Sequence, residues 1–255
     1  MGFTIKKEGK FEFIEEGNGE QTIICLHGLF GALSNFTAIV NDFKKKYRVV
    51  VPLLPIFELP VREATLEGLL DHVNEFISLK NYQNLHIVGN SLGGHIALLF
   101  VLGNVHPALS LTITGSSGLF ESAMGSTFPK RGDYEYIKQK VLHTFYDPIM
   151  ATKEVVDEVY DIVNDRNKAI RIIATAKSAI RHNLEDKMEN INVPTLIIWG
   201  EDDIITPPFV ATKFDELIAD SELKFIPKCG HAPMMEHSKV FNNLMEEFYN
   251  SRFSQ

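Results

Sequence analysis

The sequence predicts an α/β protein, a doubly wound and mostly parallel sheet with a helical cap inserted into it. Two observations predict this class. Short apolar runs alternate with helical patterns over most of the chain, whereas between residues 117 and 190 the pattern is helical only. A chain of 255 residues is long enough for one large core that carries such an insertion.

The predicted strands are short runs that are mostly apolar on both faces, which is typical of strands buried inside a parallel sheet. They cover residues 22–26, 47–51, 85–88, 109–113 and 195–199. Helical patterns separate or follow them, at residues 35–43, 65–79, 91–102, 208–219 and 239–249. This alternation predicts right-handed βαβ units around the sheet.

An antiparallel hairpin is predicted at the N-terminal edge of the sheet. Residues 10–15 alternate between apolar and polar side chains, and the turn-forming sequence Gly17-Asn18-Gly19 follows them. An edge strand next to a tight turn produces this pattern.

The helical cap is predicted from residues 117–190, between two strands of a core that comprises residues 1–116 and 191–255. Within it, apolar residues recur with helical spacing, and Thr152 and Asn167 stand where helix N-caps are expected. Because ligands of open α/β sheets bind at the carboxyl edge, we expect the cap to lie over a site there.

Composition and charge exclude several partner classes. A formal net charge of −8 argues against nucleic acid and anionic membranes as partners, because both favour an excess of Lys and Arg. No run approaches the length of a membrane-spanning helix, and the N-terminus has no signal-peptide pattern. Cys25 and Cys229 are expected to be free, buried thiols, so a cytoplasmic location is expected.

A candidate nucleophile lies in Gly89-Asn90-Ser91-Leu92-Gly93, which matches G-x-S-x-G. The motif follows a predicted strand and precedes a predicted helix, the context that it requires. Glycines at both ends allow the sharp turn that lifts the Ser91 side chain out of the chain, and the helix N-terminus favours negative charge there.

A serine nucleophile needs a base and an acid that orients the base. Glu201-Asp202-Asp203 follows a strand that ends at Trp199, and His231 follows a short apolar run at residues 223–226. The order serine, acid, histidine is the one in which these groups follow a G-x-S-x-G turn. Among the other histidines, His86 lies inside a predicted strand and His95 lies one helical turn past Ser91. His106, His143 and His182 lie at helix ends or in the cap, so His231, in a strand-end loop after the acid, is the preferred base.

An oxyanion intermediate needs two backbone N–H donors. Leu92 follows the nucleophile, and Leu29 lies in the loop His27-Gly28-Leu29-Phe30-Gly31 after the first predicted core strand. We expect their N–H groups to form the oxyanion hole, with Phe30 as the alternative second donor. His27 is expected to hold this loop rather than to contact substrate.

Four motifs occur together in this order: H-G-L-F-G, G-N-S-L-G-G, W-G-E-D-D-x-x-x-P and C-G-H. Over residues 20–250 the chain therefore resembles the α/β-hydrolase superfamily. The first motif is similar to small bacterial carboxylesterases. The Asn90 turn and the cap sequence Arg181-His182-Asn183-Leu184 are similar to the meta-cleavage-product C–C bond hydrolases.

This chain departs from the C–C hydrolases in two places. They usually have Trp directly after the catalytic histidine, where this chain has Ala232-Pro233. After the second core strand they usually have Asp-x-x-Gly-x-Gly, where residues 53–59 here are mostly apolar.

The resemblance implies a triad of Ser91, Asp203 and His231. In the family's turn the acid is third after the glycine, which selects Asp203 over Asp202, and Pro207 follows. The expected activity is hydrolysis of a small carboxylic ester through an acyl-enzyme on Ser91. The expected substrate-binding residues, from the core and the cap, are Phe30, Asn90, Phe120, Tyr134 and Tyr146.

Alternative functions on the same fold are C–C bond hydrolysis of a diketone, a lactonase or haloperoxidase-like activity, and a ligand receptor with slow turnover. We expect a small-molecule ester as the partner and neither a metal nor an organic cofactor. The natural substrate and the oligomeric state stay open.

Overall fold

The computed structural model describes residues 2–31, 36–120 and 130–253. Within these ranges the strands form one eight-stranded sheet in the order β1-β2-β4-β3-β5-β6-β7-β8. Six strands run parallel, and β1 and β2 pair antiparallel at one edge. The strands are β1 Lys6–Glu8, β2 Phe11–Glu16, β3 Thr22–Leu26, β4 Arg48–Pro52, β5 Leu85–Asn90, β6 Ala108–Thr114, β7 Thr195–Gly200 and β8 Ser221–Ile226.

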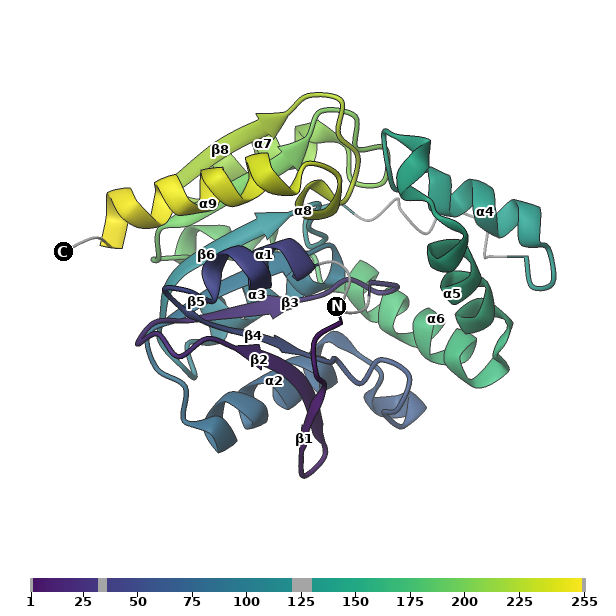
Figure 1. Cartoon of the computed structure of the whole chain (residues 1–255), viewed down its shortest axis with the longest axis horizontal. Helices are drawn as coiled ribbons and strands as arrows, with labels where there is room; N and C mark the ends of the chain where they lie inside the picture. The colour runs from purple at the N-terminus through teal and green to yellow at the C-terminus, as the bar shows by residue number, and fades with distance from the viewer. Residues whose placement is uncertain (1, 32–35, 121–129, 254–255) are drawn as a thin grey trace.

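Helices cover both faces of the sheet, which confirms the predicted doubly wound class (Figure 1). One face packs against α2 (Leu66–Lys80), α3 (Leu92–Gly103) and α7 (Pro208–Leu217). The other packs against α1 (Thr37–Phe43), α8 (Pro233–Glu236) and α9 (Ser238–Phe253).

Side-chain alternation explains why the central strands are apolar throughout. In β3, Ile23 and Cys25 belong to the core on one face, and Ile24 and Leu26 belong to the core on the other. All five β3 residues are buried, as a strand covered on both faces requires.

The predicted N-terminal hairpin is wrong in its partner. The strand β2 is antiparallel and near the edge as expected, but its hairpin partner is β1, which precedes it. The turn at Gly17–Gly19 instead leads to β3, and β2 pairs with β4 on its other side. Alternating side chains identify a strand but do not identify its neighbour.

The segment between β6 and β7 is helical, as predicted. It contains α4 (Tyr134–Leu142), η3 (Pro148–Met150), α5 (Lys153–Asn164), α6 (Arg166–Arg181) and η4 (Glu185–Asn190). In Figure 1, α4, α5 and α6 project to one side of the sheet. Ile137, Val141, Val156 and Val163 form a small apolar cluster of their own, which supports the proposed division into core and cap.

One of the two predicted N-caps in the cap is correct. The Thr152 hydroxyl accepts from Val155 N at the start of α5. Asn167 is not an N-cap, because Asp165 fills that role for α6 and its carboxylate accepts from Asn167 N and Lys168 N. A single residue, Asp165, therefore ends α5 and begins α6. The predicted start of α1, at residue 35, lies outside the described residues.

Helix α6 is fixed to the core by a row of polar contacts to the segment 59–67. Arg171 Nε donates to Leu59 O (2.7 Å), and Thr175 Oγ1 donates to Ala64 O (3.2 Å). Further along, Ser178 Oγ accepts from Leu66 N (3.1 Å), and His182 pairs with Glu67. Spacings of four and three residues place Arg171, Thr175 and Ser178 on one face of α6. His182 directly follows the helix and continues the row.

No helix in the described ranges is long and apolar enough to span a bilayer.

Candidate active site

Ser91 occupies the sharp turn between β5 and α3. Its φ is +56°, which is a strained value for a residue with a side chain. Added Cβ atoms at Gly89 and Gly93 would lie only 2.4 Å from Gly93 O and 2.0 Å from Leu26 O, so both positions require glycine. The turn is held by a hydrogen bond from Ser91 N to Thr114 O (3.1 Å).

Asp203, not Asp202, contacts His231. The distance from His231 Nδ1 to Asp203 Oδ2 is 2.9 Å, and both side chains are buried. Asp202 and Glu201 are exposed. Because the carboxylate accepts the Nδ1 proton, Nε2 of the neutral imidazole is left as the proton acceptor.

Thr206 and Ile205 also hold the Asp203 carboxylate in place. The hydroxyl of Thr206 donates to Asp203 Oδ2 (2.9 Å), and its N–H, together with that of Ile205, donates to Asp203 Oδ1 (2.9 and 2.8 Å). Trp199 Nε1 in turn donates to Thr206 O (2.8 Å). Thr206 was not among the residues predicted from the sequence. Its signal is the spacing Asp-x-x-Thr, in which an aspartate accepts from residues two and three positions ahead.

Three parallel strands bring these groups to one edge of the sheet. Ser91 follows β5, Asp203 follows β7 and His231 follows β8. Gly115 lies between Ser91 and His231, and an added Cβ there would be 2.8 Å from His231 Nδ1. The residue before it, Thr114, accepts the Ser91 N–H. The end of β6 therefore connects the serine turn to the His231 ring.

Asn90 is bonded inside the protein, and its expected contact with substrate stays a prediction. Its side chain is 4% exposed, and its Nδ2 donates to Thr114 O and to His231 O, both at 3.1 Å. Both amide hydrogens are therefore used inside the protein. These two hydrogen bonds of Asn90 were not predictable from the sequence, because they depend on the approach of two distant loops.

The loop expected to supply one oxyanion-hole donor lies against Ser91. An added Cβ at Gly28 would be 3.3 Å from Ser91 Cβ. His27 holds the loop, as expected, since its Nε2 accepts from Leu54 N (3.0 Å) and its Nδ1 donates to Gly28 O (2.9 Å). Burial lowers the pKa of His27, which keeps the ring neutral. Leu29 follows Gly28 in this loop, and Leu92 is the first residue of α3.

The remaining predicted substrate-binding residues lie in different surroundings. Phe30 packs against the apolar cluster of the cap, and the Phe120 ring meets the Phe209 ring edge to face with centroids 5.2 Å apart. Tyr134 is engaged inside the cap, where its hydroxyl donates to Asp157 (2.7 Å). Tyr146 is 48% exposed. Phe30 and Phe120 thus lie between core and cap, whereas Tyr134 packs with cap helices.

His95 and Ser117 support the backbone of the nucleophile. Ser117 N donates to Ser91 O (3.2 Å), and its hydroxyl lies 3.3 Å from His95 Nδ1. His95 is fully buried, and burial lowers its pKa to about 4. It is therefore a neutral packing residue near pH 7.

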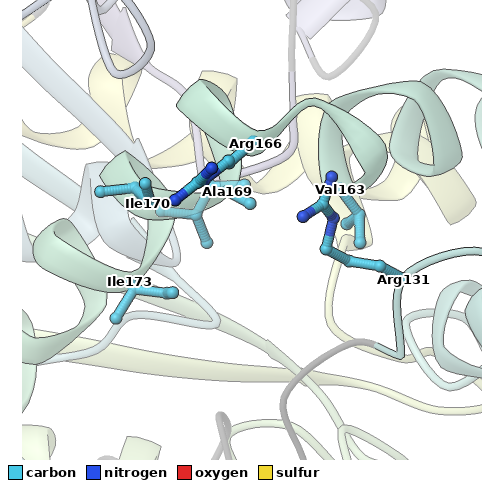
Figure 2. Close-up of a pocket in the computed structure, with 7 residues that line it drawn as sticks. Arg131, Val163, Arg166, Ala169, Ile170 and Ile173 are labelled. Carbon is cyan, nitrogen blue, oxygen red and sulfur yellow. The ribbon is translucent and has the colours of Figure 1, made fainter.

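A cavity lies in the cap and is lined by cap residues. Its volume is about 310 Å³, and Figure 2 shows Arg166 beside Ala169 and Ile170 of α6, with Arg131 beside Val163 of α5 across from them. Ile172 and Ile173 complete the lining.

In the part of the chain that the structure describes, no group of three His, Cys, Asp or Glu side chains is placed to hold a metal. Cys25 and Cys229 are free and buried, as predicted. Burial raises the pKa of both thiols, so neither is a reactive thiolate.

Comparison with known proteins identifies the family. The model of the alpha/beta hydrolase family matches residues 23–244. The chain belongs to the alpha/beta hydrolase family. This membership confirms the resemblance of the four motifs and the fold that they predict.

Several known proteins are similar to this chain over nearly its whole length. A solved alpha/beta hydrolase enzyme from a sediment metagenome of the Mar Chica lagoon is 40% identical, with a TM-score of 0.80 and coverage of 98% of this chain and 99% of that one. A solved serine hydrolase involved in carbazole degradation is 27% identical, with a TM-score of 0.80 and coverage of 95% of each chain. A 2-hydroxy-6-oxononadienedioate/2-hydroxy-6-oxononatrienedioate hydrolase of Cupriavidus pinatubonensis is 26% identical, and the match covers 96% of this chain and 94% of that protein.

Proposed function

We propose that this alpha/beta hydrolase is a serine hydrolase that cleaves a small carboxylic ester through an acyl-enzyme on Ser91. The observation that carries the proposal is the placement of the three groups. A strained serine at a strand-to-helix turn and a buried His231–Asp203 pair at 2.9 Å lie at the same edge of the sheet.

In the first half of the reaction, Ser91 Oγ attacks the ester carbonyl carbon and His231 Nε2 takes its proton. The carbonyl oxygen becomes an oxyanion that accepts hydrogen bonds from Leu92 N–H and Leu29 N–H, and the N-terminus of α3 adds a favourable field. His231 then gives the proton to the departing alkoxide, so an alcohol leaves and the acyl group stays on Ser91.

In the second half, water replaces the alcohol. His231 takes a proton from the water as it attacks the acyl carbon, and the collapse of the second oxyanion returns the proton to Ser91 Oγ. The products are an alcohol and a carboxylic acid, and the enzyme is regenerated. Asp203 holds the Nδ1–H and stabilises the imidazolium in each half, while Thr206 keeps the carboxylate in place.

The apolar surroundings support an uncharged acyl group. Phe30 and the Phe120–Phe209 pair lie at the boundary between core and cap. These aromatic side chains favour apolar over charged substrate groups.

A second candidate is hydrolysis of a C–C bond in a diketone by the same triad. It is supported by the names of similar proteins, which include a 2-hydroxy-6-oxo-6-(2'-aminophenyl)hexa-2,4-dienoic acid hydrolase of Metapseudomonas resinovorans, 27% identical over 94% of this chain. The apolar residues 53–59 and the sequence Ala232-Pro233 are the features that favour the ester.

Turnover of two substrate series separates the candidates. We expect p-nitrophenyl acetate and butyrate to be cleaved with higher kcat/KM than a coloured ring-fission diketone. Fast loss of the diketone colour with negligible ester cleavage would instead assign the C–C activity. Very slow turnover of both, with strong stabilisation by a ligand, would favour a receptor, and preference for cyclic esters would favour a lactonase.

A further inference from the structure

The loop that carries His231 lies directly against the linker that follows α4 in the cap. His231 N donates to Thr144 O (2.8 Å). Gly230 is so close to the linker that an added Cβ would lie 2.6 Å from Thr144 O and 2.9 Å from Tyr146 N. The backbone of the proposed base therefore touches the cap.

The carboxylate of Glu236 joins the same two segments. Its Oε2 accepts from Gly230 N (2.7 Å), next to His231, and its Oε1 accepts from Asp147 N (2.6 Å) in the cap linker. Each oxygen thus takes one backbone donor from a different segment. Hydrogen bonds to an ionised carboxylate are stronger than those between neutral groups.

The linker is also anchored by Phe145, whose half-buried side chain packs against both the core cluster around α9 and the small cluster of the cap. On the opposite side of the histidine, His231 O accepts from Asn90 Nδ2 (3.1 Å), directly before the nucleophile. The backbone of His231 is therefore bonded to the cap through its N–H and to the serine turn through its carbonyl.

We propose that Glu236 is a positioning residue that couples the seating of the cap linker, residues 144–147, to the placement of His231 beside Ser91. This inference rests on the proposed serine-hydrolase function. The coupling makes the proton-transfer geometry depend on the linker: when the linker leaves its position, the His231 N–H loses Thr144 O, and the Glu236 carboxylate that holds Gly230 loses its bond to Asp147 N. A displacement of about 1 Å at a reacting group can cost about 100-fold in rate.

Glu236→Gln tests the coupling with the smallest change in shape. A glutamine side chain has one carbonyl oxygen and one NH2 group, so it can accept from only one of the two N–H donors and opposes the other. We expect kcat for a p-nitrophenyl ester to fall about 10- to 100-fold while KM changes less than threefold. The matched control is Glu247→Gln on the exposed side of α9, which carries the same charge change and is expected to retain full activity.

The same variants are labelled with a fluorophosphonate, which reports the nucleophilicity of Ser91 without substrate binding. Absence of labelling in the parent protein would overturn the proposed function itself. With the parent labelled, equal kcat in a folded Glu236→Gln and in Glu247→Gln would overturn the coupling alone. A loss confined to KM would do the same, because it would assign Glu236 to substrate binding.

Amide hydrogen exchange of the parent protein keeps the inference testable if Glu236→Gln does not fold. We expect the amides of Gly230, His231 and Asp147 to be protected to a similar degree, because one opening event exposes all three. Exchange of Asp147 that is more than about 100-fold faster than that of Gly230 would show that the linker and the histidine loop open separately.

Discussion

Asp202 and Asp203 are adjacent in the chain but have opposite environments. Asp203 is 2% exposed and accepts four hydrogen bonds, from Ile205 N, Thr206 N, Thr206 Oγ1 and His231 Nδ1. Asp202 points to solvent, and only its backbone N–H is used, in a bond to Cys229 O (2.9 Å). The two carboxylates therefore cannot exchange roles.

Conservative replacement of each carboxylate tests this difference. We expect Asp203→Asn to lower kcat about 10⁴-fold at neutral pH, because an amide favours the wrong imidazole tautomer and does not stabilise the imidazolium. Asp202→Asn should stay within a few-fold of the parent. Steady-state kinetics of the two single variants decides the matter, and a crippled Asp202→Asn would move the acid by one position.

Among single residues, the sequence predicted the serine, the acid and the histidine better than the residues that hold them in place. The G-x-S-x-G turn, the strand-end acid and the later histidine are recognisable locally because each is tied to a strand end. The contacts of Asn90 and Glu236 join loops that are distant in the sequence, and Thr206 contacts the buried carboxylate of Asp203. Residue type alone did not reveal these contacts.

Among the elements, α6 attaches the cap to the core more firmly than its apolar pattern suggests. The row formed by Arg171, Thr175, Ser178 and His182 contacts the segment 59–67 through hydrogen bonds and an ion pair. The helical period predicted that α6 exists. It did not predict this polar face, because the period describes only where apolar residues recur.

Ser178→Ala tests the contribution of that face to stability. The variant leaves the buried Leu66 N without its acceptor, which should cost about 1–2 kcal/mol and lower Tm by about 3–6 °C. Turnover at 25 °C should be nearly unchanged because Ser178 is outside the site. Ser251→Ala, in the exposed last turn of α9, is the control and should shift Tm by less than about 1 °C. An equal shift in both variants would contradict the role of the α6 face.

For the whole molecule, the order of the strands was less predictable than their existence. The buried parallel strands were located within one or two residues, because their apolar runs are continuous. The pairing of β2 with β4 joins residues far apart in the sequence and leaves no local pattern. The division into core and cap stays a prediction that the separate apolar cluster supports.

Burial also makes the stability of the fold depend on pH. Desolvation lowers the pKa of His72, His86 and His95 to about 4 each. Because the unfolded chain binds protons at these groups near pH 6.5 and the folded chain does not, their stabilising contribution is complete above pH 6.5 and decreases as the pH falls toward 4.

We therefore expect the free energy of unfolding, from urea titrations, to fall by about 3 kcal/mol or more between pH 7 and pH 4.5. His72→Phe should reduce this pH dependence, since phenylalanine can occupy the site beside Phe11 without titrating. A free energy of unfolding that is constant over this interval would contradict the neutral, buried state of these histidines.

The central claim is that Ser91 is the nucleophile, and covalent labelling tests it most directly. A fluorophosphonate should add one phosphonyl group, which peptide mass spectrometry locates on Ser91. Ser91→Ala should stay folded, take up no label and lose about 10⁶-fold in kcat, a loss of the size known for a triad nucleophile. Labelling at another residue, or labelling and ester cleavage that persist in Ser91→Ala, would contradict the account.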